Sequence, residues 1–277
     1  MRPATVGVFD SGVGGLSVWI EIARQLPHVD LVYVADQAHC PYGLRSRDEI
    51  RDLAEGITAF MIERGADVIV VACNTASAAA LHALRATRER SPVPIVGMEP
   101  AIKPAAAHTR SGHVGVIATQ VTFQGELFAS LLERFAQGVT VHTQVCPGLV
   151  ERVEAGQLED EATLSLLRRY LDPLLEAGID TLVLGCTHYP FLRPAISRVV
   201  GPAVEIVDPA PAVARQTGRV LAQARPDAPR DRQGQWLLYT SGDVAPFEHI
   251  TARLLRRGGD VQAVRWDRSA RLVPAHR

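Results

Sequence analysis

Two cysteines end apolar runs at corresponding places in the chain. The run in VIVVACNTAS (68–77) ends at Cys73, and the run in TLVLGCTHYP (181–190) ends at Cys186. Because ligands of open parallel sheets bind at the carboxyl ends of the strands, we expect both thiols to line one crevice. Two thiols on opposite sides of a substrate carbon can exchange its proton, one acting as base and the other as conjugate acid. The pair therefore predicts inversion of a stereocentre by proton transfer.

Each of the two thiols has a candidate helper in the sequence. Both cysteines precede predicted helices, whose N-termini lower the pKa of a thiol. Asp10 ends an earlier predicted strand and could assist Cys73, whereas His188 follows Cys186 closely and could assist that thiol. From the residues alone, a core role for the two cysteines and a helix-capping role for His188 stay open.

Other chemistries fit the sequence less well. A redox pair would need its sulfurs within disulfide reach, and acyl transfer would need a histidine base but no second thiol. Cysteine and histidine do not cluster at the short spacings of zinc sites, so we expect no metal. Cys40 and Cys146 are interpreted as core residues. A protein that binds an amino acid without turning it over stays an alternative from another functional class.

The glycine-rich turn DSGVGG (10–15) opens the first predicted helix and could hold an anion with its backbone amides. It meets only half of the dinucleotide-binding pattern, for which Asp36 would supply the acidic residue. We favour the simpler interpretation that Gly14 and Gly15 let the strand turn tightly into the helix.

Apolar segments alternate with amphipathic ones, which is typical of an α/β fold with parallel sheets. The predicted strands are 5–10, 29–36, 67–73, 93–98, 113–119, 140–146 and 180–186. The predicted helices are 16–26, 47–65, 75–90, 123–137, 159–178 and 191–201.

The pattern restarts near residue 99, where the second half of the chain repeats the first. RGADVIVVACNTAS aligns with AGIDTLVLGCTHYP. This weak repeat predicts two similar lobes, each a largely parallel sheet flanked by helices, related by a pseudo-two-fold axis with the site in the cleft between them. We expect the first lobe to comprise residues 1–98 plus 210–277 and the second lobe residues 99–209.

The charge of the chain argues against nucleic-acid and membrane partners. Its 277 residues include 29 basic and 30 acidic side chains, with a formal net charge of −1, so no basic excess favours nucleic acid or anionic lipid. No apolar run is long enough to span a membrane, and the first residues lack the pattern of a secretory signal. With four cysteines and no export signal, we expect a cytoplasmic protein without a disulfide framework.

Six segments resemble the glutamate racemase family in sequence and in order: GVFDSGVGGLSV, YVADQAHCPYG, VACNTAS, GMEPA, LGCTHYP and YTSGD. They span nearly the whole chain, and their combination is specific to that family. The resemblance implies an enzyme without a cofactor that converts L-glutamate, its small-molecule partner, to D-glutamate for peptidoglycan synthesis. Since family members are often dimers, a homodimer is a further expectation. A related racemase acting on aspartate stays an alternative, because the sequence does not show the depth of the pocket.

The resemblance also implies roles for individual residues. Cys73 would act on the D-enantiomer with the help of Asp10, and Cys186 on the L-enantiomer with the help of His188.

The family has a further glutamate shortly after a Cys-Pro pair. In the segment CPGLVERVEAG it corresponds to Glu154, with Glu151 as the competing choice, because this segment departs from the family pattern. The residues that the resemblance implies in substrate binding are Asp10, Ser11, Pro41, Tyr42, Gly43, Asn74, Thr75, Thr119, Thr122, Thr187 and His188.

Overall fold

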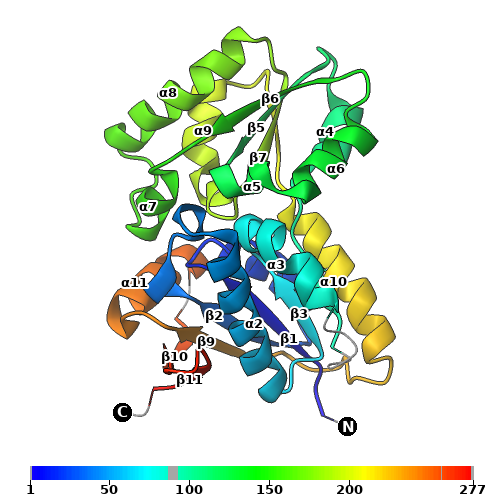
Figure 1. Cartoon of the computed structure of the whole chain (residues 1–277), viewed down its shortest axis with the longest axis vertical. Coiled ribbons are helices and arrows are strands. Elements are labelled where there is room, and N and C mark those ends of the chain that lie inside the picture. Colours follow the sequence, from blue (N-terminus) through cyan, green and yellow to red (C-terminus); the bar gives the residue numbers. More distant parts are fainter. Residues whose placement is uncertain (1, 87–92, 257, 276–277) are drawn as a thin grey trace.

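The computed structural model describes residues 2–86, 93–256 and 258–275 and contains two β-sheets. Figure 1 shows the sheets in two lobes, one above the other, each flanked by helices. The first sheet has the strand order β11-β10-β9-β2-β1-β3-β4, and β11 runs antiparallel to β10. Its strands are β1 (Thr5–Asp10), β2 (Asp30–Ala35), β3 (Val68–Val71), β4 (Ile95–Gly97), β9 (Trp236–Thr240), β10 (Asp260–Trp266) and β11 (Leu272–Pro274).

The second sheet repeats the order of four strands of the first. It is parallel with the order β6-β5-β7-β8, which matches β2-β1-β3-β4 in the first sheet. Strand β1 thus corresponds to β5, and β3 to β7, so the predicted α/β fold with two similar lobes is confirmed. The strands are β5 (His113–Ala118), β6 (Thr140–Val145), β7 (Thr181–Gly185) and β8 (Glu205–Val207).

Helices cover the sheets because the central strands are mostly apolar and need burial on both faces. Every residue of β3 and of β7 is buried, as expected for parallel strands covered on both faces. The first lobe carries α1 (Leu16–Gln25), α2 (Arg47–Glu63), α3 (Asn74–Ala86), α10 (Ala210–Ala224) and α11 (Val244–Leu255). The second carries α4 (Ile102–His108), α5 (Gln120–Gln124), α6 (Glu126–Phe135), α7 (Leu149–Glu154), α8 (Glu161–Glu176) and α9 (Arg193–Val200).

The helices depart from the sequence prediction, or cannot be compared with it, in several places. The helix predicted over 75–90 is described as α3 up to Ala86, and residues 87–90 lie outside the described residues. The helix predicted over 123–137 is wrong as a single element, because the extended backbone of Gly125 separates α5 from α6. Periodicity does not predict the short helix α7, which begins after Gly148 in a left-handed conformation (φ 87°).

The C-terminal segment returns to the first sheet. Strand β9 pairs in parallel with β2, and β10 pairs in parallel with β9. The lobe boundaries drawn from the sequence, 1–98 plus 210–277 and 99–209, stay a prediction. Among the described residues, no helix is both long enough and apolar enough to cross a membrane.

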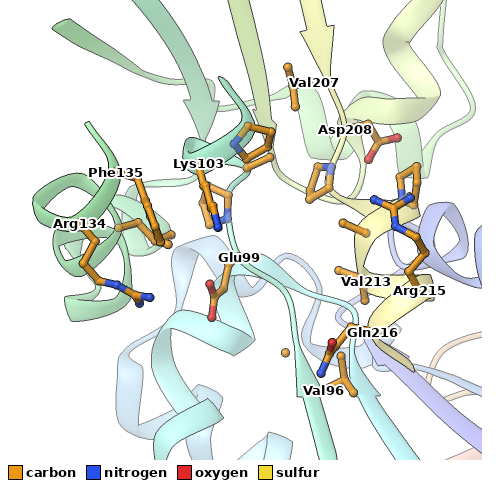
Figure 2. Close-up of a pocket in the computed structure, with 18 of the residues that line it drawn as sticks. Val96, Glu99, Lys103, Arg134, Phe135, Val207, Asp208, Val213, Arg215 and Gln216 are labelled. Carbon is orange, nitrogen blue, oxygen red and sulfur yellow. The ribbon is translucent and has the colours of Figure 1, made fainter. Parts of the chain in front are cut away.

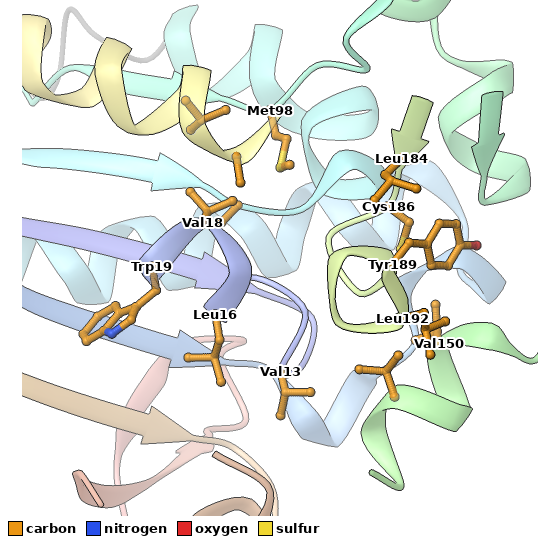
Figure 3. Packing of buried hydrophobic residues seen from close by; sticks show 14 of the residues in the cluster. Val13, Leu16, Val18, Trp19, Met98, Val150, Leu184, Cys186, Tyr189 and Leu192 are labelled. Carbon is orange, nitrogen blue, oxygen red and sulfur yellow. The ribbon is translucent and has the colours of Figure 1, made fainter. Parts of the chain in front are cut away.

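One apolar cluster joins the two lobes. It contains Val13 and Leu16 beside β1 and α1, together with Val150 and Leu192 from the second lobe (Figure 3). These four side chains are buried, and burial of a Val or Leu side chain contributes about 1.5–3 kcal/mol. Apolar packing therefore holds the strand ends of the two lobes against each other.

Gly185, the last residue of β7, sets the position of Cys186 and leaves no space for a side chain. A Cβ there would lie 2.8 Å from the backbone oxygen of Ile117 and 2.9 Å from the Cβ of Ala118, both on β5. Because a central strand cannot move aside without loss of its ladder, Gly185→Ala is expected to lower the free energy of unfolding by about 1–3 kcal/mol, measured in urea. Gly258→Ala is the control, since a Cβ at Gly258 meets nothing within 4 Å. Equal stability of the two variants would contradict the prediction.

A candidate acid–base site at the strand ends

Cys73 lies between the end of β3 and the first residue of α3. Its thiol is buried, and the backbone N–H of Ala76 donates to its Sγ at 3.4 Å. The sequence predicted a lowered thiol pKa at this helix N-terminus, and that prediction is wrong for Cys73. Burial raises the pKa of Cys73 well above its ordinary value, the charge of Asp10 adds to the rise, and the amide of Ala76 opposes it without prevailing.

Cys186 lies at the corresponding position after β7. It contacts a histidine, and that histidine contacts a carboxylate. Its Sγ is 3.7 Å from Nδ1 of His188, and Nε2 of His188 donates to Oε1 of Glu154 at 2.6 Å. Burial would lower the pKa of His188, but the hydrogen bonds to Cys186 and Glu154 and their charges outweigh burial and raise it well above 6.5. A buried imidazolium that pairs with a carboxylate can stabilise a thiolate beside it.

Glu154, at the end of α7, is the glutamate that contacts this histidine. Its carboxylate also accepts from the backbone N–H of Val13 at 2.8 Å and from Nε2 of Gln37 at 2.7 Å. Burial raises the pKa of Glu154, but the hydrogen bonds from His188, Val13 and Gln37 prevail and lower it overall. Glu151 is exposed on the same helix, so of the two candidate glutamates it is Glu154 that contacts His188.

Asp10 is fully buried at the end of β1 and contacts the second lobe. One carboxylate oxygen accepts from the backbone N–H of Gly12 at 2.8 Å, and the other accepts from Oγ1 of Thr187 at 2.9 Å. Burial raises its pKa, although the charge of His188 and these two hydrogen bonds oppose the rise.

The glycines of the turn after β1 leave room for the side chains of the site. A Cβ at Gly12 would overlap the carboxylate of Glu154, and a Cβ at Gly14 would overlap the imidazole of His188. A Cβ at Gly15 would come within 2.6 Å of the Cβ of Asp10. Close approach of functional groups therefore requires these glycines, which is more than the tight turn that the sequence suggested.

Asp36, the acidic residue of a dinucleotide pattern, is engaged by the protein itself. Its buried carboxylate accepts hydrogen bonds from Tyr42 Oη (2.7 Å), Ser241 Oγ (2.7 Å) and Trp266 Nε1 (2.8 Å), and His39 Nδ1 lies 3.0 Å away. It is not free to bind a ribose. Sequence reasoning did not identify its actual role, which is to hold the loop containing Tyr42 against the C-terminal strands.

Most of the residues predicted to bind substrate line one small cavity between the lobes. Asn74 is notable among them, because its side-chain oxygen and nitrogen are both buried and have no hydrogen-bond partner in the described part of the chain. Three predicted residues lie behind the lining, namely Asp10, Thr122 and Glu154. The cavity is lined by Ser11, Pro41, Tyr42, Gly43, Cys73, Asn74, Thr75, Thr119, Val150, Cys186, Thr187 and His188.

Hydroxyl groups connect the lobes on the Cys73 side of this cavity. Oγ1 of Thr75, on α3, lies 2.9 Å from Oγ1 of Thr119, which lies 3.0 Å from Oγ1 of Thr122 in the second lobe. The cavity volume is only about 10 Å³, about the space of one water molecule. The cavity in this arrangement is therefore smaller than an amino acid.

A larger cavity of about 570 Å³ lies where the chain passes between the lobes (Figure 2). Its charged lining includes Glu99 and Lys103 after β4, and Asp208 and Arg215 after β8. None of the predicted site residues lines it. Cavity size therefore does not identify the site, whereas the grouping of thiols, imidazole and carboxylates does.

The His188–Glu154 pair predicts a measurable shift in the titration of the imidazole. Removing the carboxylate charge in Glu154→Gln is expected to lower the pKa of His188, because its hydrogen-bonded counter-charge is lost. Nitrogen-15 NMR of labelled histidine measures this pKa directly. Glu151→Gln is the matched control on the same helix and should leave the titration unchanged. A His188 pKa that is the same in both variants would contradict the prediction.

The same pair gives a pH dependence of stability. Because the pKa of His188 is raised in the folded state, the protonated imidazole contributes to the free energy of unfolding. This contribution is complete below about pH 6.5 and is lost as the pH rises through the folded-state pKa. The free energy of unfolding of Glu154→Gln should therefore be lower than that of the unaltered protein. The difference between the two should be largest at mildly acidic pH. Urea unfolding across this pH range measures the difference, and a pH-independent gap would contradict the assignment.

Known proteins match the chain over most of its length. The family model described as Asp/Glu/Hydantoin racemase matches residues 11–217. A glutamate racemase of Herpetosiphon aurantiacus is 53% identical over 252 residues, which cover 90% of this chain and 97% of the relative. A glutamate racemase of Pseudomonas aeruginosa is 56% identical over 223 residues, which cover 80% of this chain and 83% of the relative.

Solved structures agree with the sequence relatives. The Escherichia coli glutamate racemase, solved in complex with L-glutamate and the activator UDP-MurNAc-Ala, superposes with a TM-score of 0.85 at 35% identity and covers 99% of this chain and 100% of its own. A glutamate racemase of Bacillus anthracis gives a TM-score of 0.84 at 35% identity, covering 95% and 98%. The resemblance drawn from six segments is confirmed, and the chain belongs to the glutamate racemase family.

Proposed function

We propose that the chain interconverts L- and D-glutamate by direct proton transfer at Cα, without a cofactor. The observation that carries the proposal is the equivalent placement of Cys73 and Cys186, which follow corresponding strands of two repeated sheets and line the same cavity. A substrate carbon between two thiols can lose its proton to one and receive a proton from the other.

The surroundings of the two thiols support complementary roles. From L-glutamate, Cys186 acts as the base, and the His188–Glu154 pair beside it supports that role. The thiolate removes the Cα proton, and the thiol of Cys73 delivers a proton to the opposite face. Burial favours the protonated form of Cys73, which suits a donor in this direction. In the reverse direction Cys73 becomes the base, and the nearby carboxylate of Asp10 assists it.

Neutral donors are proposed to bind the two carboxylates of the substrate. The cavity lining contains no lysine or arginine among the described residues. Backbone amides at the start of α3, the unpartnered amide of Asn74 and the hydroxyls of Ser11, Thr75 and Thr187 supply hydrogen bonds instead. A helix N-terminus adds a favourable field for a carboxylate.

The wider setting follows from the same proposal. D-glutamate would supply peptidoglycan synthesis, in the cytoplasm, and a homodimer is the proposed assembly. The four free cysteines fit a reducing compartment. Light scattering in solution tests the assembly, and a monomeric mass would exclude the dimer.

Proton exchange in deuterium oxide tests the reaction itself. The protein is incubated with L-glutamate in D₂O without added cofactor, while NMR follows the Cα–H signal and polarimetry follows the rotation. We expect both signals to decay, the rotation toward zero. Turnover of aspartate in place of glutamate would change the substrate of the proposal. Measurable glutamate binding without exchange would overturn it in favour of a binding protein.

Single thiol variants test the two-base mechanism. Cys73→Ala and Cys186→Ala are each expected to lower the racemisation rate at least about 100-fold from either enantiomer, because each removes one of the two proton-transfer groups. Cys146→Ala is the control, since this buried cysteine lies outside the cavity lining and should retain activity. Full racemisation by either of the first two variants would refute a mechanism that needs both thiols.

A further inference from the structure

Three side chains with metal-ligating atoms meet behind the cavity. Sγ of Cys40, Oε1 of Glu154 and Nε2 of His188 all lie within 4.8 Å of one another. Sγ of Cys40 is 3.6 Å from Oε1 of Glu154, and this oxygen is 2.6 Å from Nε2 of His188. Cys40 is separated from Glu154 by 114 residues in sequence, so spacing along the chain could not reveal the group.

The donor set is the one that Zn²⁺ prefers in proteins. Zinc binds thiolate sulfur at about 2.3 Å and imidazole nitrogen or carboxylate oxygen at about 2.0–2.2 Å, in tetrahedral geometry. In such a tetrahedron the ligating atoms lie about 3–4 Å from one another. The three atoms need only small adjustments to reach these separations, and water can complete the fourth position.

A second cavity, separate from the substrate cavity, reaches this group at Glu154. Its volume is about 360 Å³, and both Gln37 and Glu154 contribute to its lining. Asp243, from the start of α11, lies on the same lining and adds a negative charge at the approach. The carboxylate of Glu154 thus faces the second cavity, while His188 faces the substrate cavity.

We propose that Cys40, Glu154 and His188 form an inhibitory site for Zn²⁺. On binding, Cys40 releases its thiol proton and His188 releases its Nε2 proton to solvent, so that a thiolate, a neutral imidazole and a carboxylate hold the cation. The metal takes no part in racemisation. It inhibits because its coordination bonds replace the hydrogen bond between His188 and Glu154, which positions the imidazole beside Cys186. The inhibition, though not the binding, rests on the proposed function.

A variant of Cys40 can distinguish metal binding from the reaction itself. Cys40 has no role in the proposed proton transfer, whereas Glu154 and His188 do, so replacing Cys40 removes a ligand and leaves the basal reaction intact. Cys146 is the matched control, since its Sγ approaches the backbone oxygen of Gln144 at 3.5 Å and stands outside the cluster.

Cobalt and zinc binding to the unaltered protein, Cys40→Ser and Cys146→Ser test the proposal. Co²⁺ replaces Zn²⁺ as a spectroscopic probe and gives a sulfur-to-cobalt charge-transfer band in the near ultraviolet, measured without turnover. We expect the band in the unaltered protein and in Cys146→Ser but not in Cys40→Ser. The Zn²⁺ concentration for half inhibition should rise at least about tenfold in Cys40→Ser alone.

X-ray absorption of the zinc-loaded, unaltered protein keeps the test decisive if Cys40→Ser does not fold. One sulfur at about 2.3 Å with nitrogen and oxygen neighbours supports the site. A spectrum without sulfur, a cobalt band that survives Cys40→Ser, or equal zinc sensitivity of both variants would overturn it. Because the cobalt and X-ray readouts need no turnover, they stand even if the protein does not racemise glutamate.

Discussion

The surroundings of both thiols depend on the contacts that the turn between β1 and α1 makes with the second lobe. Asp10 accepts a hydrogen bond from Thr187, the N–H of Val13 donates to Glu154, and Gly14 leaves the space that His188 fills. The side chains of Thr187, Glu154 and His188 that meet this turn come from the second lobe. A buried carboxylate that loses its partners costs about 1–3 kcal/mol or more, so the lobes have one favourable closed arrangement.

The repeated sheets place the two thiols at equivalent positions. The residues around the thiols do not repeat, so the two surroundings differ. Strands β3 and β7 deliver Cys73 and Cys186 to matching positions. The neighbours of the two thiols then diverge. Asp10, with a raised pKa, lies on the Cys73 side, whereas a charged His188–Glu154 pair lies beside Cys186. The two thiols therefore have different surroundings, which the repeat alone would not provide.

The sequence predicted the features that short segments determine. Apolar strands buried on both faces, the internal repeat and the two strand-end cysteines follow from local pattern, and the structure agrees. Contacts between distant segments could not be predicted. Asp36 meets Ser241 and Trp266, which are 205 and 230 residues away, and no local signal marks that network. At Cys73, burial raises the pKa of the thiol and outweighs the field of the helix N-terminus. Burial depends on tertiary packing, which the sequence pattern does not show.

Closure of the lobes also sets the charge state of the site. The cavity of about 10 Å³ is smaller than glutamate, so the structure describes the lobes in a closed arrangement. Glu154 and His188 come from the second lobe, whereas Val13 and Gln37, which donate to the Glu154 carboxylate, come from the first. Those two donors help to lower the pKa of Glu154, so closure strengthens the anion that balances His188. Contacts from both lobes therefore set the charge of the pair beside Cys186.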